Sequence, residues 1–157
     1  MKRVKFDSPI GLLEICESEE KIIRIEIVSS EKDFEEIKTP LLEEAKEQLS
    51  EYFNGKREVF DFPIEFSGTD FQKAVWGELM KIPFGETRTY GEIAAAVGKP
   101  KASRAVGGAC NRNHMLIAVP CHRVIGANGN LTGFACGTDK KTWLLGHEAI
   151  DKKENAK

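Results

Sequence analysis

The chain has 157 residues, of which 41% are hydrophobic and 31% charged, a length and composition typical of one compact domain or two small lobes. Its 23 lysines and arginines nearly balance 25 aspartates and glutamates, and the net charge of -2 argues against a uniformly basic nucleic-acid-binding protein. The two halves differ, however: residues 1–66 hold 10 basic and 17 acidic side chains, whereas residues 67–157 hold 13 basic and 8 acidic ones. We therefore expect an acidic lobe followed by a basic one.

Positive charge is concentrated between Arg88 and Arg123. Six basic side chains lie in this stretch against the single acidic residue Glu92, a local excess that suits a polyanionic ligand. A solvated basic surface without any ligand is the alternative explanation.

The first residues show no sign of an export signal. Charged residues interrupt them from the second position onward, and no stretch of the chain approaches the length of a membrane span. We expect no contact with a membrane and a cytoplasmic location, associated with the nucleoid in a prokaryote or nuclear in a eukaryote. In such a compartment the four cysteines remain reduced, so thiol chemistry is available.

The acidic lobe is predicted to begin with strands and to continue with a helix. Residues 4–28 alternate β-prone runs with turn signals, which predicts a hairpin or meander. Thr39 as N-cap and Pro40 at the first helical position then predict a helix that ends near Gly55.

A domain boundary is predicted after this helix. Residues 59–66 are interpreted as a strand fragment that leads into a linker at residues 67–68, where the charge also changes sign. We expect a supporting α+β domain over residues 1–66, a mostly helical domain over residues 67–150, and a frayed tail over residues 151–157.

The basic lobe is predicted to open with a helix at the capping box of Thr69 and Gln72. The buried stripe expected for this helix consists of Phe71, Ala74, Val75 and Leu79. A short helix over residues 91–97 ended by Gly98, a turn around residues 99–100 and a second helix over about residues 101–112 then predict a helix-turn-helix.

The second helix of this motif is predicted to present one face to a ligand. The expected inward residues are Ala102, Ala105, Val106 and Ala109, and the expected outward residues are Lys101, Arg104, Gly108 and Asn111. Gly107 and Gly108 each cost about 1 kcal/mol of helix stability relative to alanine, so something requires their missing side chains. Close helix packing and close approach of a nucleic-acid backbone are both possible reasons.

The remaining elements are a strand and a helix. The apolar run over residues 116–119 predicts a strand that stops at Pro120, and residues 139–149 predict a last helix. Its core side chains are expected to be Trp143, Leu144 and Leu145.

A cysteine lies between these two elements in a setting that favours a nucleophile. Cys121 precedes His122 and Arg123, two groups able to stabilise a thiolate. An inert buried cysteine is one alternative. A zinc site is a weaker one, because the four potential ligands lack the two-residue spacing of common zinc hooks. Those four residues are Cys110, Cys121, His122 and Cys136.

The sequence around Cys121 resembles the O6-alkylguanine-DNA alkyltransferase family. The resemblance rests on residues 120–125 (PCHRVI), 129–134 (GNLTGF) and 144–148 (LLGHE), and on an ordered set of matches that begins at Phe71. It covers essentially all of residues 69–148, whereas the acidic lobe is matched mainly through residues 8–11.

The resemblance implies direct-reversal DNA repair. Cys121 would attack the alkyl carbon on O6 of guanine, and O4-alkylthymine is left open as a second substrate. The product is a thioether, which offers water no good leaving group, so each molecule would react once. No cofactor or metal is required, and the partner would be double-stranded DNA bound by a monomer.

The family also implies roles for the residues around the thiol. His122 would act through a water as the base that deprotonates Cys121, and Glu148 would orient its imidazole. Asn113 would tie the active-site loop together by hydrogen bonds, although a turn asparagine is the alternative. Tyr90 would donate a proton or hydrogen bond to N3 of the leaving guanine, with a core tyrosine as its alternative.

The resemblance further implies that the target base is turned out of the duplex. Arg104 would fill the vacated space while the second helix lies in the minor groove, with little sequence preference. The residues expected to contact DNA are Arg104, Lys101, Gly107, Gly108, Thr89 and Arg123. Those expected around the flipped base are Cys110, Val124, Phe134 and Ala135.

Several positions depart from the family pattern. Phe134 replaces a usual tyrosine, His114 replaces the proline that commonly follows the asparagine, and Thr89 replaces a serine. Cys136 adds a thiol near the site, for which a filler at a variable position is the simpler interpretation.

Three other functions compete with alkyl transfer. A lesion sensor would lack the reactive thiol, and Cys121 argues against it. A helix-turn-helix regulator would need a dimerisation element that is not evident. A thiol hydrolase would need turnover through an acyl-enzyme and would leave the basic helices unexplained.

Overall fold

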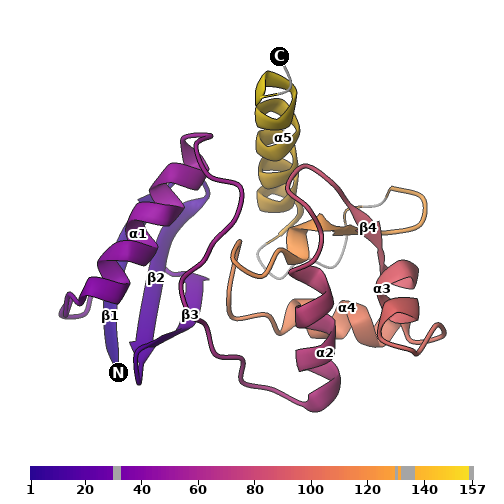
Figure 1. Ribbon diagram of the computed structural model, residues 1–157, viewed down its shortest axis with the longest axis horizontal. Coiled ribbons are helices and arrows are strands. Elements are labelled where there is room, and N and C mark those ends of the chain that lie inside the picture. Colours follow the sequence, from indigo (N-terminus) through magenta and orange to yellow (C-terminus); the bar gives the residue numbers. More distant parts are fainter. Residues whose placement is uncertain (30–32, 130, 132–136, 156–157) are drawn as a thin grey trace. The chain divides into compact units, whose positions relative to one another are not determined.

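The computed structural model describes residues 1–29, 33–129, 131 and 137–155, and it divides into two compact units (Figure 1). The first unit consists of residues 1–67 together with the short segment 114–116, and the second contains the other described residues. The first is a sheet with a helix and the second is mostly helical, so the predicted α+β class is confirmed.

The first unit is built on an antiparallel meander, as predicted. Its strands are β1 (Lys2–Ser8), β2 (Gly11–Ser18) and β3 (Lys21–Ile27), in the order β1-β2-β3. The loop between β2 and β3 has two residues, Glu19 and Glu20, at φ +51° and +64°. Positive φ at both central positions is typical of a type I′ turn, whose twist matches that of the strands.

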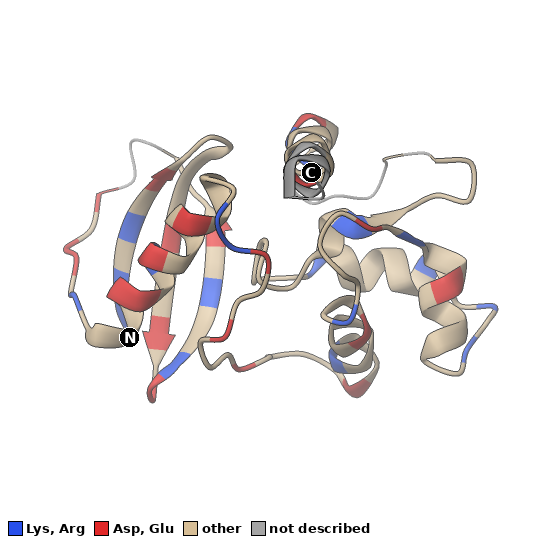
Figure 2. Cartoon of the chain, turned by 45° about the horizontal axis from the view of Figure 1, so that its top comes forward, with Lys and Arg blue, Asp and Glu red and all other residues tan. Residues whose placement is uncertain are grey.

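Helix α1 (Pro40–Phe53) packs on this sheet and begins where the sequence predicts. Thr39 Oγ1 accepts a hydrogen bond from the Leu42 backbone N–H at 3.0 Å, and Pro40 occupies the first turn. The helix buries Leu42, Ala45, Gln48, Leu49 and Tyr52. Its opposite face is exposed and acidic through Glu43, Glu44 and Glu47, as the bands in Figure 2 show.

The strand predicted over residues 59–66 is wrong. Only Ile64 forms a bridge, to Ile22, and the flanking residues are irregular. The proline at position 63 explains the short pairing: it has no N–H to donate, and only its carbonyl accepts, from the Ile22 N–H at 2.9 Å.

The second unit begins with α2 (Asp70–Leu79), whose capping box of Thr69 and Gln72 is formed as predicted. Helices α3 (Tyr90–Ala96) and α4 (Ser103–Asn111) follow, separated by a turn with Gly98 at φ +79°. They form the expected helix-turn-helix.

Two short strands frame the cysteine segment. The turn η1 (Cys121–Arg123) leads into β5 (Val124–Ile125), which pairs in parallel with β4 (Arg88–Thr89). The sequence analysis did not predict this pairing. It fastens the segment after Cys121 to the residues that precede α3.

The residues before Cys121 do not form the predicted strand. Residues 116–118 form a turn and Ile117 has φ +71°, a conformation that a β-branched residue rarely adopts. The apolar side chains of residues 116–119 are buried within this turn and not within a sheet.

Helix α5 (Thr138–Asn155) extends beyond the predicted end into the residues expected to be a frayed tail. Leu144 is buried as predicted, but Trp143 is 37% exposed and stacks on His147. Two other predicted core residues, Ala74 and Ala105, are also exposed. Of the helices in the described residues, none is long and apolar enough to cross a membrane.

Candidate active site

The thiol of Cys121 lies at the start of a tight turn inside the second unit. Its side chain is buried, at 2% exposure. Asn113, just after α4, donates its side-chain N–H to the Val119 carbonyl at 2.9 Å and to the Cys121 sulfur at 3.2 Å. One amide thus closes the loop between residues 113 and 121 and stabilises negative charge on the sulfur.

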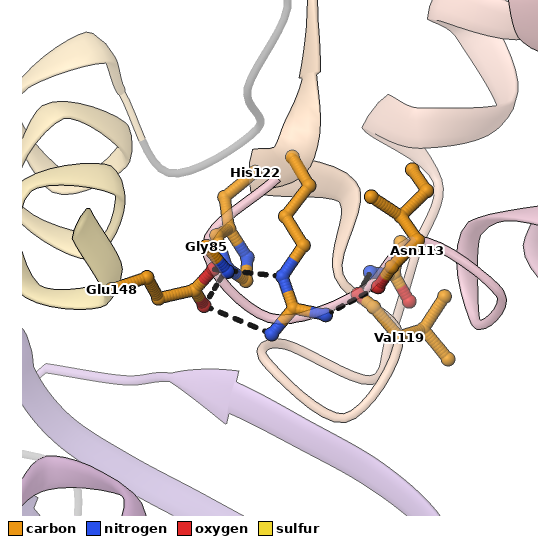
Figure 3. A network of polar contacts seen from close by, with 7 residues as sticks. Gly85, Asn113, Val119, His122 and Glu148 are labelled. Atoms are coloured by element: carbon orange, nitrogen blue, oxygen red, sulfur yellow. Dashed lines mark hydrogen bonds and ion pairs between the residues drawn. The ribbon is translucent and has the colours of Figure 1, made fainter. Parts of the chain in front are cut away.

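A second group of contacts begins at the next residue (Figure 3). His122 Nε2 lies 2.6 Å from Glu148 Oε2, and Arg123 binds the same carboxylate through Nε and Nη2 at 2.8 and 3.0 Å. Arg123 Nη1 donates to the Ile82 carbonyl at 2.8 Å. The three charged or titratable side chains are almost completely buried, so their mutual contacts replace water.

The charge states of this group follow from its contacts. Burial alone would raise the pKa of Glu148, but the hydrogen bonds and charges of His122 and Arg123 outweigh it and hold the pKa below its usual range. Burial lowers the pKa of His122 and outweighs the opposing effect of Glu148. The buried group is therefore an ionised carboxylate, an arginine cation and a neutral imidazole at neutral pH.

The neutral imidazole can act as a base at one defined atom. Nε2 faces a carboxylate that can only accept, so Nε2 carries the proton and donates. Nδ1 is then the basic nitrogen, and it has no hydrogen-bond partner among the described protein atoms. Glu148 thus fixes the tautomer, which is the relation expected between a base and its orienting carboxylate.

A buried lysine near the thiol was missed by the sequence analysis. Lys141 on α5 is fully buried, and its Nζ lies 5.7 Å from the centre of the Tyr90 ring. Burial lowers the pKa of Lys141, and the nearby thiols of Cys121 and Cys110 act in the opposite direction. The sequence spacing could have indicated this position, because Lys141 and Glu148 are seven residues apart and therefore lie on one face of the helix.

Tyr90 and Cys110 complete this environment as protonated groups. Burial, together with the neighbouring thiols, raises the pKa of Tyr90 to about 12. Burial and the Cys121 thiol raise the pKa of Cys110 to about 12 as well. At neutral pH Tyr90 is a hydrogen-bond donor, and Cys110 is a poor nucleophile.

The face of α4 opposite the core is open. Arg104, Lys101 and Gly108 are exposed as predicted. A Cβ added at Gly108 would meet no described atom within 4 Å, and one added at Gly107 would meet only the Tyr90 ring, at 3.9 Å. Close helix packing of the described residues therefore does not require either glycine.

Two residues predicted to contact DNA have other partners. Thr89 is the N-cap of α3, where its side chain accepts from the Glu92 N–H. Arg123 is only 5% exposed and is bound to Glu148 and Ile82. A buried carboxylate needs a buried cation, and the sequence does not reveal that requirement.

The predicted base pocket is described only in part. Cys110 and Val124 are buried in the second unit, whereas Phe134, Ala135 and Cys136 lie outside the described residues. Within the described part of the chain, no group of three or more His, Cys, Asp or Glu side chains could hold a metal ion.

Together these features define a class of protein: one with a helix-turn-helix and a buried cysteine that is followed by a histidine oriented by a carboxylate. Two family models match the chain, the 6-O-methylguanine DNA methyltransferase ribonuclease-like domain over residues 1–66 and the DNA binding domain of the same methyltransferase over residues 70–150. The chain belongs to the 6-O-methylguanine DNA methyltransferase family.

Individual relatives agree along nearly the whole chain. A methylated-DNA–protein-cysteine methyltransferase of Methanosarcina acetivorans is 50% identical over 145 residues, which cover 89% of this chain and 93% of that protein. The constitutive enzyme of that name from Bacillus subtilis is 48% identical over 157 residues, covering 94% and 95%. The Mycobacterium tuberculosis OGT crystallised in complex with DNA superposes with a TM-score of 0.87 at 41% identity, covering 96% and 94%.

Proposed function

We propose that this chain is a methylated-DNA–protein-cysteine methyltransferase that repairs O6-alkylguanine in DNA by moving the alkyl group onto Cys121. The observation that carries the proposal is the hydrogen bond from Asn113 to the Cys121 sulfur, next to a histidine oriented by Glu148. A sulfur that accepts a hydrogen bond is prepared to hold negative charge, and a neutral imidazole is prepared to take the thiol proton.

The reaction transfers one alkyl group and one proton. The Cys121 thiol gives its proton to Nδ1 of His122 through a water, and the sulfur attacks the alkyl carbon of the lesion. The S–C bond forms as the bond between that carbon and O6 breaks, and its electron pair stays on the guanine. The purine recovers the proton, so the products are an S-alkylcysteine and an intact guanine.

Tyr90 and Lys141 support the departure of guanine. A phenol with its pKa raised to about 12 is protonated at neutral pH and can donate to N3 of the purine. The lysine over its ring lies near both Cys110 and Cys121, so its positive charge favours a thiolate within the buried site. Neither group regenerates the thiol, because a thioether has no good leaving group for water to displace.

The open face of α4 is the proposed DNA contact. The glycines let the duplex backbone approach, and Arg104 fills the space left when the target base is turned out. Contacts through the minor groove read shape and backbone with little sequence preference, as repair of scattered lesions requires.

Intact-mass measurement tests the proposal. The purified protein is mixed with a duplex that holds a single O6-methylguanine, and the modified peptide is mapped. The expected result is one methyl group on Cys121 that stops at one equivalent, with unmodified guanine in the DNA. Tight binding to the lesion without any gain of mass would instead identify a sensor.

A further inference from the structure

The loop that joins Asn113 to Cys121 passes through the first unit before it reaches the thiol. Residues 114–116 lie alongside β3, where the Ile25 N–H donates to the His114 carbonyl at 2.7 Å and the Leu116 N–H donates to the Ile25 carbonyl at 3.0 Å. The loop is thus held twice, by β3 at residues 114–116 and by the Asn113 amide between its two ends.

A pair of side chains reinforces the attachment to β3. His114 Nδ1 lies 2.8 Å from Glu26 Oε1, and Glu26 directly follows Ile25 on the strand. The side chains are 51% and 36% exposed, so the pair lies at the protein surface. The function proposed above makes no use of either residue.

We propose that the His114–Glu26 pair is a positioning device for Cys121, which holds residue 114 on β3 and thereby keeps the Asn113 amide aimed at the sulfur. His114 and Asn113 are adjacent in the chain, so a displacement of the His114 backbone also displaces Asn113. The hydrogen bond from Asn113 to the Cys121 sulfur would then weaken, because hydrogen bonds weaken steeply as their angle departs from linearity. The methyl transfer that this pair would serve rests on the proposed function. The attachment of residue 114 to β3 rests only on the hydrogen bonds described above.

The loop needs such support because its backbone is strained. Ile117, three residues after His114, has φ +71°, and a conformation of this kind persists only where the surrounding structure imposes it. A weaker attachment at His114 lets the turn relax, and the residues that follow it lead directly to Cys121.

Charge reinforces the pair. The charged groups that face His114 are Glu26, Arg24, whose Nε is 3.7 Å from the second Glu26 oxygen, and Glu14, which is opposite Glu26 on β2. A hydrogen bond to a carboxylate is stronger than one between neutral groups, so the Glu26 carboxylate holds the imidazole more firmly than an amide would.

Rate constants of matched variants test the proposal. Methyl transfer from a duplex with O6-methylguanine is compared at neutral pH for the wild type, Glu26→Gln, His114→Ala, His114→Gln and the double variant Glu26→Gln/His114→Ala. The alkylation of Cys121 by iodoacetamide is measured in parallel by peptide mass, because this small reagent needs no DNA. Glu47→Gln removes the same charge from an exposed site on α1 and is the matched control.

The expected loss for Glu26→Gln or His114→Ala is about threefold, the size typical of an exposed polar pair. The double variant is no slower than either single one. His114→Gln keeps a hydrogen-bond donor for the carboxylate, so it loses less than His114→Ala. Glu47→Gln is unchanged.

Wild-type rates in both single variants, additive losses in the double variant, or the same loss in Glu47→Gln would each overturn the positioning role. The iodoacetamide series separates this proposal from the function. If the wild type takes up no methyl group but iodoacetamide shows the expected ratios between the variants, the positioning role stands and the proposed function fails.

Discussion

Two buried cysteines of this protein have opposite environments. Cys16 on β2 donates its S–H to Glu14 Oε1 at 3.1 Å, and burial, with that hydrogen bond and the carboxylate charge, raises the pKa of Cys16 to about 12. Cys121 accepts a hydrogen bond from Asn113 and has a lysine nearby. Both are buried to a similar degree, so the partner of the sulfur, rather than its burial, separates an inert thiol from a candidate nucleophile.

The largest effect is expected from removing one of these two thiols and not the other. Cys121→Ala abolishes alkyl transfer and leaves DNA affinity nearly unchanged, because the open face of α4 is intact. Cys16→Ala is still expected to accept one methyl group per molecule on Cys121. Intact mass and lesion-duplex binding measure both variants, and a loss of DNA binding in Cys121→Ala would make this residue structural.

Glu148→Gln is expected to have the next largest effect. The amide no longer fixes the His122 tautomer, an error that costs up to about 10⁴-fold in a comparable triad, and it leaves Arg123 buried without a counter-charge. We expect transfer to slow by at least about tenfold and the free energy of unfolding to fall by about 3–5 kcal/mol. Single-turnover rates and urea denaturation measure the two effects, and an unchanged rate would remove Glu148 from the relay.

The same variant changes the response of stability to acid. The folded-state pKa of Glu148 lies below its unfolded value, so its contribution to stability is present above about pH 4.3 and is lost as pH falls toward the folded pKa. His122 has a lowered folded pKa and acts in the same direction below about pH 6.5. Glu148→Gln should therefore lose less stability on acidification below pH 4.3 than the wild type does.

Arg104→Ala separates base extrusion from the chemistry at Cys121. Unstacking costs a few kcal/mol, so we expect the reaction with a lesion in duplex DNA to slow on the order of 100-fold. The reaction with free O6-methylguanine needs no extrusion and should keep its rate. Equal losses on both substrates would contradict the role of Arg104 in the duplex.

Lys141→Met sharpens the comparison between the thiols. The substitution keeps the length of the side chain but removes the positive charge near Cys121 that favours the thiolate. We expect methyl transfer and iodoacetamide alkylation of Cys121 to slow together by about tenfold. Cys16, in the other unit, keeps its reactivity. Slower methyl transfer with an unchanged rate of alkylation would show that Lys141 acts on the departure of guanine and not on the thiol.

Local sequence signals predicted the frame of the molecule but not its buried charges. The capping box of Thr69 and Gln72 and the Thr39 cap depend on neighbours three residues away, so they could be predicted without tertiary structure. The contact between His122 and Glu148 was predicted from the family resemblance, and the structure contains it. Arg123 and Lys141 look like surface residues in the sequence, because only the folded chain encloses their partners.

The same limit explains the errors in the apolar segments. Residues 116–119 have the composition of a strand, but the bridge to β3 is at Met115 and Ile117 lies in a turn at φ +71°. Trp143 has the large apolar side chain typical of a core residue, yet the buried face of α5 is occupied by Lys141, Leu144 and Glu148. Buried charged residues therefore occupy the helix face on which hydrophobicity alone would place the aromatic ring.

The smallest effect is expected from Glu14→Gln. The change removes the carboxylate that accepts from Cys16, but burial is the larger cause of the raised pKa, so this pKa should fall from about 12 and stay above the ordinary thiol value. Methyl transfer at Cys121 is expected to be unchanged, because the variant keeps both partners of the hydrogen bond between Glu26 and His114. In a background that lacks the other three cysteines, ultraviolet absorbance of the thiolate follows the titration of Cys16. A fall to the ordinary value would show that the carboxylate, and not burial, keeps this thiol inert, and the contrast with Cys121 would then rest on a single oxygen atom.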